Sequence, residues 1–126
     1  MDMRTPLRRV RGLGAAHEGT AAFWRQRVTS LAAVPLSVFL IAACVTIAGA
    51  DYATVRAALA SPLLAIALLL LVLVYVVHMR IGMEEIVLDY VHAPGPKYAS
   101  LILNTFFCAV IGLVCVFAIL KLAFGS

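Results

Sequence analysis

Charged side chains are scarce in this chain of 126 residues: 13% of its residues are Asp, Glu, Lys or Arg, whereas about a quarter of an ordinary soluble domain is charged. The hydrophobic residues amount to 64%, and the mean hydropathy is +1.06. A soluble domain of this length buries only about two-thirds of its surface, so it has no room for so much apolar surface. This composition excludes a soluble globular protein, a disordered chain and a nucleic-acid-binding module, and it predicts an integral membrane protein.

Cysteine is also rare, and its three positions lie inside apolar runs: Cys44, Cys108 and Cys115. An odd number of thiols in such sequence does not form a disulfide framework. The chain has no Cys-x-x-Cys motif and no cluster of cysteine with histidine, which argues against a zinc site. We interpret the three cysteines as small, adaptable packing residues.

Long hydrophobic runs dominate the remainder of the chain. Residues 1–27 form a polar, basic tail, and residues 28–126 form a membrane domain with spans at about 28–50, 62–90 and 100–121. The first run is long enough to cross about 30 Å of hydrocarbon at 1.5 Å per residue. The fold class expected is therefore an all-α membrane protein with three transmembrane helices.

Short punctuating segments separate these spans. Residues 51–60 are expected to form a short connection, and Ser61-Pro62 is typical of a helix start, with serine as N-cap and proline in the first turn. The second helix, about 43 Å long at 1.5 Å per residue, then extends beyond the hydrocarbon. The Ala-Pro-Gly-Pro segment 93–96 ends it, because two prolines and a glycine break helices.

The distribution of Lys and Arg predicts the orientation. Six arginines in the tail, together with Arg80 and Lys97, lie on one side, whereas only Arg56 and Lys121 lie on the other. Because loops rich in Lys and Arg remain in the cytoplasm, we expect the N-terminus in the cytoplasm and the C-terminus in the periplasm.

Ionisable residues gather near the end of the second span. His78, Gly82, Glu85 and Asp89 are spaced four, three and four apart, which places them on one face of a helix. About 20 residues cross the hydrocarbon, so His78 is expected to lie inside it by about one turn. Such residues at membrane depth are expensive and usually functional.

His78 has three interpretations: a hydrogen bond to a neighbouring helix, a proton relay, or an axial ligand to haem iron. Gly82, one turn further on, removes a side chain where a flat macrocycle or another backbone would approach. The other two histidines are His17 in the tail and His92 in the loop. A six-coordinate haem would therefore need its second ligand from another polypeptide.

Two further groups of residues lie near the same end. Tyr90, beside Asp89, is either an interfacial belt residue or a phenol that donates a hydrogen bond to a carbonyl of a lipophilic ligand. Asp89 would orient that phenol or relay a proton. Trp24 and Arg27, just before the first span, form an interfacial anchor or, alternatively, Arg27 binds a carboxylate such as a haem propionate.

Two patterns in the sequence resemble a known family. The run 78–83, followed by Asp89 and Tyr90, fits the pattern H-x-x-x-G-M-x5-D-Y. The entry to the first span contributes Gly19-Thr20, Phe23-Trp24, Gln26-Arg27, Thr29 and Pro35-Leu36. Together with three spans in a chain of this size, these residues resemble the hydrophobic membrane-anchor subunits of succinate dehydrogenase, respiratory complex II, of the alphaproteobacterial and mitochondrial type.

This resemblance implies a location in the bacterial inner membrane and a place in a larger enzyme. In that family the hydrophobic anchor packs with a cytochrome b subunit, and the two hold one haem b and a ubiquinone site beneath a flavoprotein subunit and an iron–sulfur subunit. FAD and the iron–sulfur clusters belong to those last two partners.

The resemblance also implies roles for individual residues. His78 supplies one axial haem ligand and the cytochrome b subunit supplies the other. Tyr90 hydrogen-bonds a quinone carbonyl with Asp89 in the same region, and Arg27 lies near the haem propionates and the quinone pocket. This chain then contributes no succinate-binding residue.

Two functions follow from these observations. The first is an electron-transfer subunit that ligates haem b and helps to form a ubiquinone-reducing site. The second is a non-catalytic membrane scaffold or assembly subunit, or a component of a small transporter. The second gives no reason for the H…GM…DY pattern, and a transporter is expected to carry a polar or charged residue near the middle of a span.

Overall fold

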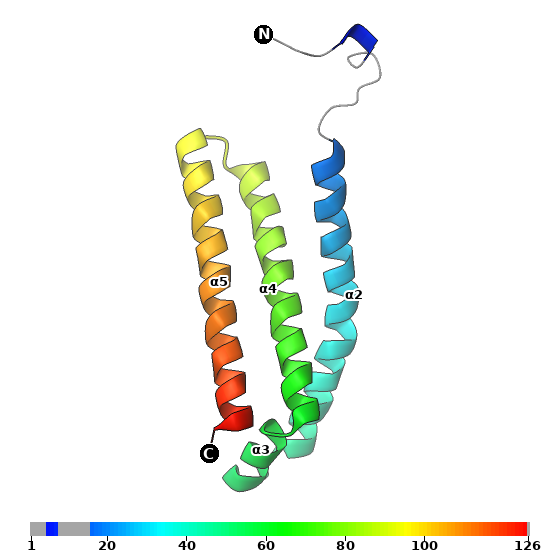
Figure 1. Cartoon of the computed structure of the whole chain (residues 1–126), viewed down its shortest axis with the longest axis vertical. Coiled ribbons are helices and arrows are strands. Elements are labelled where there is room, and N and C mark those ends of the chain that lie inside the picture. The colour runs from blue at the N-terminus through cyan, green and yellow to red at the C-terminus, as the bar shows by residue number, and fades with distance from the viewer. Residues whose placement is uncertain (1–4, 8–15, 126) are drawn as a thin grey trace.

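The computed structural model describes residues 5–7 and 16–125. Within residues 16–125 the chain forms α2 (Ala16–Ile47), α3 (Tyr52–Leu59), α4 (Pro62–Tyr90) and α5 (Pro94–Phe124). Three of these helices are long and run down, up and down in the view of Figure 1, with α4 between α2 and α5. All three are long and apolar enough to cross a membrane, which confirms the predicted fold class.

The second and third long helices meet at the Ala-Pro-Gly-Pro segment. The bounds of α4 are those predicted, but α5 begins at Pro94, earlier than the predicted start at about residue 100. Pro94 and Pro96 occupy the first turn of α5, where a helix needs no backbone N–H from them. The same prolines therefore end one helix and begin the next.

The first long helix, α2, starts earlier in the sequence than the first apolar run. It begins at Ala16, so Arg25 and Arg27, predicted as part of the tail, lie within it. The boundary at residue 28 marks a change of hydropathy, not the start of the helix. The four tail arginines at positions 4, 8, 9 and 11 lie outside the described residues.

The connection between α2 and α4 contains a short helix where a plain connection was expected. Gly49, with φ of +78°, makes the turn after α2, and this backbone conformation favours glycine. The Thr54 hydroxyl donates to Asp51 Oδ1, and this hydrogen bond lowers the pKa of the Asp51 carboxyl. Arg56 Nη2 then donates to the Gly125 carbonyl at 2.8 Å, which ties α3 to the end of α5.

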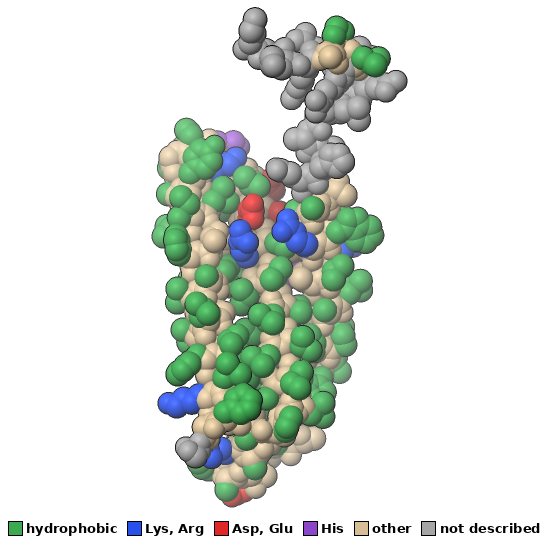
Figure 2. Space-filling model, in the orientation of Figure 1, with side chains coloured by type: hydrophobic (Ala, Val, Ile, Leu, Met, Phe, Trp, Pro, Cys, Tyr) green, Lys and Arg blue, Asp and Glu red, His purple; other side chains and the backbone are tan. Residues whose placement is uncertain are grey.

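The packing inside the chain is sparse. α4 contacts both α2 and α5, whereas α2 and α5 do not contact each other among the described residues. The buried residues lie on α4 and α5: Leu64, Ala65, Ile81, Val87, Asn104, Cys108 and Ile119. At most 11% of the apolar core of any span is buried, and Figure 2 shows hydrophobic side chains covering the visible face of the helices. A surface so apolar is suited to lipid or to other membrane proteins.

Candidate cofactor site between α2 and α4

The candidate site lies where α2 and α4 pack together, and its members are Gln26, Thr29, His78 and Gly82, here called the α2–α4 seam. His78 is half-buried, and its Nδ1 lies 3.0 Å from Thr29 Oγ1. Of the three interpretations of His78, the hydrogen bond to a neighbouring helix is therefore observed. It occupies one ring nitrogen and leaves Nε2 free of a protein partner among the described residues.

The surroundings of the Thr29 hydroxyl decide the tautomer of His78. Thr29 Oγ1 lies 2.8 Å from the Arg25 carbonyl and 3.0 Å from the Gln26 carbonyl. A hydroxyl carries one proton, and carbonyl oxygens only accept, so the Thr29 proton points to the backbone of α2 as threonines in helices commonly do. Thr29 then accepts from His78 Nδ1–H. The proton on Nδ1 leaves a lone pair on Nε2, which is the form of histidine that binds a metal ion.

Gly82 and Gln26 meet one turn further along the same seam. A Cβ added at Gly82 would lie 3.4 Å from Gln26 Nε2, so the absence of a side chain here admits the Gln26 amide. Gln26 Oε1 is buried and has no hydrogen-bond partner among the described residues. A buried, unpaired carbonyl oxygen is unfavourable, and the seam is thus suited to a hydrogen-bond donor from outside this chain.

Arg27 and Trp24 lie on α2 beside the seam, and both are exposed. The Arg27 guanidinium carbon lies 5.0 Å from the centre of the Phe23 ring, and Phe23 meets Trp24 edge to face at 6.1 Å and 79°. The cation–π contact holds the guanidinium without using its N–H donors. Within the described part of the chain, Arg27 has no ion-pair partner, which leaves its planar fork available to a carboxylate.

Asp89 and Tyr90 form a separate location at the end of α4. Tyr90 is the last residue of that helix and is 78% exposed. At 1.5 Å per residue it lies about 18 Å along the axis from His78. Neither side chain hydrogen-bonds to another described residue. This chain therefore brings Thr29 and His78 together but leaves Tyr90 facing outward from it.

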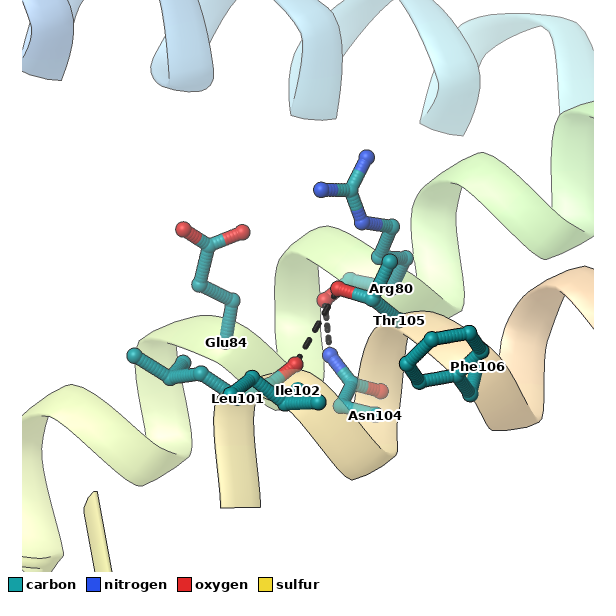
Figure 3. A pocket seen from close by; sticks show the side chains of 7 residues that line it. All are labelled: Arg80, Glu84, Leu101, Ile102, Asn104, Thr105 and Phe106. Atoms are coloured by element: carbon teal, nitrogen blue, oxygen red, sulfur yellow. Dashed lines mark hydrogen bonds between the residues drawn. The ribbon is translucent and has the colours of Figure 1, made fainter. Parts of the chain in front are cut away.

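A buried polar contact joins α4 to α5 at Arg80, two residues from His78 along α4. Asn104 is 9% exposed, and its Nδ2 donates to the Arg80 carbonyl at 2.9 Å. Cys108 Sγ donates to Asn104 Oδ1 at 3.4 Å. Figure 3 shows the Asn104 amide directed at the α4 backbone beneath Arg80. Both ends of the Asn104 amide are thus used within the chain, and its role is structural.

Comparison with known proteins identifies the family. The family model of the succinate dehydrogenase/fumarate reductase transmembrane subunit matches residues 1–120. The chain belongs to this family. It is 27% identical over 122 residues to the succinate dehydrogenase hydrophobic membrane anchor subunit of Paracoccus denitrificans, covering 97% of this chain and 94% of that protein. No solved structure matches the chain.

Family membership, together with three apolar helices, establishes a multi-pass membrane protein that acts as a membrane anchor. A member of the succinate dehydrogenase/fumarate reductase family associates with other succinate dehydrogenase subunits and forms part of an enzyme complex. This agrees with the first of the two functions considered from the sequence, and it gives no support to a small transporter.

Two residues that complete the seam were not predicted as site residues. Thr29 and Gln26 belong to the motif at the entry to the first span, but of the four seam residues only His78 and Gly82 were expected in a site. Their spacing in the sequence could have indicated this: Gln26 and Thr29 are three residues apart, and His78 and Gly82 are four residues apart. In an antiparallel pair such spacings place Gln26 opposite Gly82 and Thr29 opposite His78.

Asn104 gives the first testable prediction. Asn104→Ala removes the hydrogen bond to the Arg80 carbonyl and opens a small cavity, so we expect the free energy of unfolding of the solubilised complex to fall by about 1 kcal/mol. Thr105→Ala is the matched control, because Thr105 is exposed and bonds only to the Leu101 carbonyl within α5. Equal stability of the two variants in a denaturant titration would show that Asn104 does not join α4 to α5.

Proposed function

We propose that this chain is the membrane anchor of a succinate:quinone oxidoreductase, where it contributes one axial ligand to haem b and part of the ubiquinone-reducing site. A partner cytochrome b subunit would supply the second ligand, and the chain would anchor the flavoprotein and iron–sulfur subunits. The observation that carries this proposal is the hydrogen bond between Thr29 and His78 at 3.0 Å.

The seam fits a haem in its donor chemistry. Thr29 fixes His78 with the proton on Nδ1, so Nε2 presents its lone pair away from the bond to α2. His78 is half-buried in a strongly apolar helix. When bound, haem b supplies a one-electron redox centre. His78 would hold its iron, and Gly82 leaves the adjacent turn of α4 without a side chain.

Arg27 and Trp24 complement that role from α2. The Arg27 guanidinium carries a full positive charge, is stacked on Phe23, and has no carboxylate partner among the described residues. A haem propionate supplies the planar, anionic oxygen pair that guanidinium binds in two parallel hydrogen bonds. Trp24, 61% exposed on the adjoining surface, would pack at the edge of the quinone pocket or against a partner chain.

The quinone site is proposed at the end of α4. Tyr90 would donate its phenolic O–H to a ubiquinone carbonyl, and the bond strengthens as negative charge develops on that oxygen. Asp89, the preceding residue, would hold or deliver a proton in the same region. The free outward position of Tyr90 supports this proposal, because a ligand between subunits needs a donor that the chain has not already used.

The same end of the bundle carries most of the positive charge. Arg25, Arg27, Arg80 and Lys97 belong to the end where α2 begins, α4 ends and α5 begins, whereas Arg56 and Lys121 belong to the other (Figure 1). By the positive-inside rule, we propose that the first end faces the cytoplasm of a bacterial cell and that the membrane is the inner membrane. Ubiquinone would then be reduced on the cytoplasmic side.

An optical spectrum of the complex isolated through a tag on this chain tests the proposal. We expect a b-type haem in the dithionite-reduced minus oxidised spectrum, with a flavoprotein and an iron–sulfur protein in the same preparation. A complex that contains those two proteins but no b-type haem would contradict the haem role. It would instead support a non-catalytic scaffold.

Thr29→Val gives a finer prediction for the seam. Valine keeps the shape of threonine but accepts no hydrogen bond, so His78 Nδ1–H loses its partner. Loss of such a second partner typically weakens metal binding about 10–100-fold. We expect a lower haem content and a higher midpoint potential, because an imidazole without this bond donates less electron density. Redox titration of the haem spectrum measures both.

The matched control for Thr29 is its neighbour Ser30. The Ser30 hydroxyl donates to the Gln26 carbonyl at 2.8 Å and has no bond to His78. Ser30→Ala is expected to leave the haem spectrum and its potential as in the wild type, and Thr29→Ser is expected to restore them. A potential that is the same in the Thr29→Val and wild-type complexes would refute the orienting role of Thr29.

A further inference from the structure

Several hollows surround Arg80, which leaves α4 on a face other than that of His78. Arg80 is two residues from His78, so the two side chains leave the helix about 200° apart. Three adjoining hollows share Arg80 in their walls, with volumes of about 320, 430 and 240 Å³. They form one groove, here called the Arg80 groove, which runs over α4 between α2 and α5. This groove shares no lining residue with the proposed haem and quinone sites.

The charged groups of the Arg80 groove are not paired with one another. Arg25, Arg80, Glu84 and Glu85 line its largest hollow, yet among the described residues no ion pair within 4.0 Å joins them. Arg25 uses its Nε for the Ala21 carbonyl at 3.3 Å, and no described residue binds its terminal N–H groups. Figure 3 shows Arg80 and Glu84 projecting to the same side of α4. Two guanidinium groups and two carboxylates thus face a shared space with their charges available.

The charges on α4 are ordered along the membrane normal. Arg80 lies one turn deeper than Glu84 and Glu85, which are nearer the end of α4 at Tyr90. The two positive and two negative charges cancel. A ligand that fits carries a negative group at the deeper level and a positive group nearer the water. Carboxylates near the water also disfavour a ligand that is purely anionic.

The groove continues as an apolar channel toward the middle of the membrane. The hollow of about 240 Å³ is lined by Arg25 and Arg80 and, beyond them, by Val76, Val77, Cys108 and Ala109. A ligand with a zwitterionic headgroup and an apolar tail matches this order of charged and then apolar lining residues. A free phosphate would leave the apolar part empty.

We propose that the Arg80 groove binds one phospholipid with an ethanolamine headgroup. Its phosphate lies between the Arg25 and Arg80 guanidinium groups, where charge-assisted hydrogen bonds are strong. Its ammonium donates to Glu84 and Glu85, and the start of an acyl chain follows Val76 and Val77. A choline headgroup has no N–H to donate, and a glycerol headgroup has no positive charge.

Native mass spectrometry of the intact, delipidated complex tests the proposal. The complex is mixed with equal amounts of dioleoyl phosphatidylethanolamine, phosphatidylcholine and phosphatidylglycerol, and retained lipids are counted. We expect one phosphatidylethanolamine per copy of this chain, retained about tenfold better than the other two. Arg80→Gln is expected to reduce this retention about tenfold, with Arg80→Lys intermediate. Lys97→Gln, which removes a charge at the same end but outside the groove, is the control.

The double variant Glu84→Gln, Glu85→Gln tests ammonium binding by the two glutamates separately from phosphate binding by the two arginines. Phosphate binding is expected to survive, while the preference for ethanolamine over glycerol headgroups disappears. A second arm adds inorganic phosphate, which is expected to displace no lipid; displacement would assign the site to free phosphate and overturn the proposal. Absent or equal retention of the three lipids by the wild type, or undiminished retention by Arg80→Gln, would also overturn it. Haem content and the set of co-purified partner proteins show that each variant complex is assembled.

Discussion

Replacing His78 with alanine is expected to remove haem b from the purified complex. His78 is the one histidine of the α2–α4 seam. Its Nδ1 lies 3.0 Å from Thr29 Oγ1, so its Nε2 is the nitrogen that can bind the haem iron. Loss of the hydrogen-bond partner of a metal ligand alone weakens metal binding about 10–100-fold, so loss of the ligand itself is expected to weaken haem binding more than about 100-fold. The measurement is the haem content per complex from the reduced minus oxidised spectrum.

His92→Ala serves as the control for this experiment. His92 lies in the loop between α4 and α5 and is exposed, so its removal is expected to leave the haem content as in the wild type. Assembly is monitored by the presence of the partner proteins, because an unassembled complex would lose haem for a different reason. An unchanged b-type spectrum in an assembled His78→Ala complex would refute the assignment of His78 as a ligand.

Replacing Tyr90 with phenylalanine is expected to reduce ubiquinone reduction about 10²–10³-fold. The substitution removes one hydroxyl and keeps the ring, so the loss reports the hydrogen bond to the quinone oxygen. A donor aimed at developing negative charge typically contributes a factor of this size. Oxidation of succinate with an artificial electron acceptor is expected to remain at the wild-type rate, because we propose that this chain contributes no residue to the succinate site.

Tyr98→Phe is the matched control for Tyr90. Tyr98 is on α5 near the same end of the bundle and is 66% exposed, and we assign it no role at the quinone. Loss of the Tyr98 hydroxyl is expected to change neither the rate of ubiquinone reduction nor the rate of succinate oxidation. If Tyr90→Phe lowered both activities equally, Tyr90 would have a structural role in the complex rather than a hydrogen bond to quinone.

The placement of the spans was predictable because it depends on the length and hydropathy of runs in one dimension. α4 begins after Ser61 and ends at Tyr90 as predicted, since Pro62 suits a first turn and the Pro-Gly-Pro segment prevents continuation. The start of α2 at Ala16 was not predictable in this way. Arg25 and similar polar residues are good helix formers. The helix therefore extends from the hydrocarbon back to Ala16, and no change in hydropathy marks its first residue.

The candidate site was only partly predictable. The spacing of His78, Gly82 and Asp89 showed that they share a face of one helix, and their charge or polarity at membrane depth showed that the face matters. It did not show that Gln26 lies against Gly82, nor that Thr29 fixes the tautomer of His78. Those statements need the position of α2 relative to α4.

The sequence by itself determined that this is a membrane protein with three helical spans and an ionisable group near one end of the second. Only the tertiary structure decided which faces meet: Thr29 with His78, Gln26 with Gly82, and Asn104 with the backbone of Arg80. The physical reason is that these helices are apolar around most of their circumference. In lipid no hydrophobic driving force selects one apolar face over another, so the rotation and register of the helices are decided by close packing and by a few interhelical hydrogen bonds.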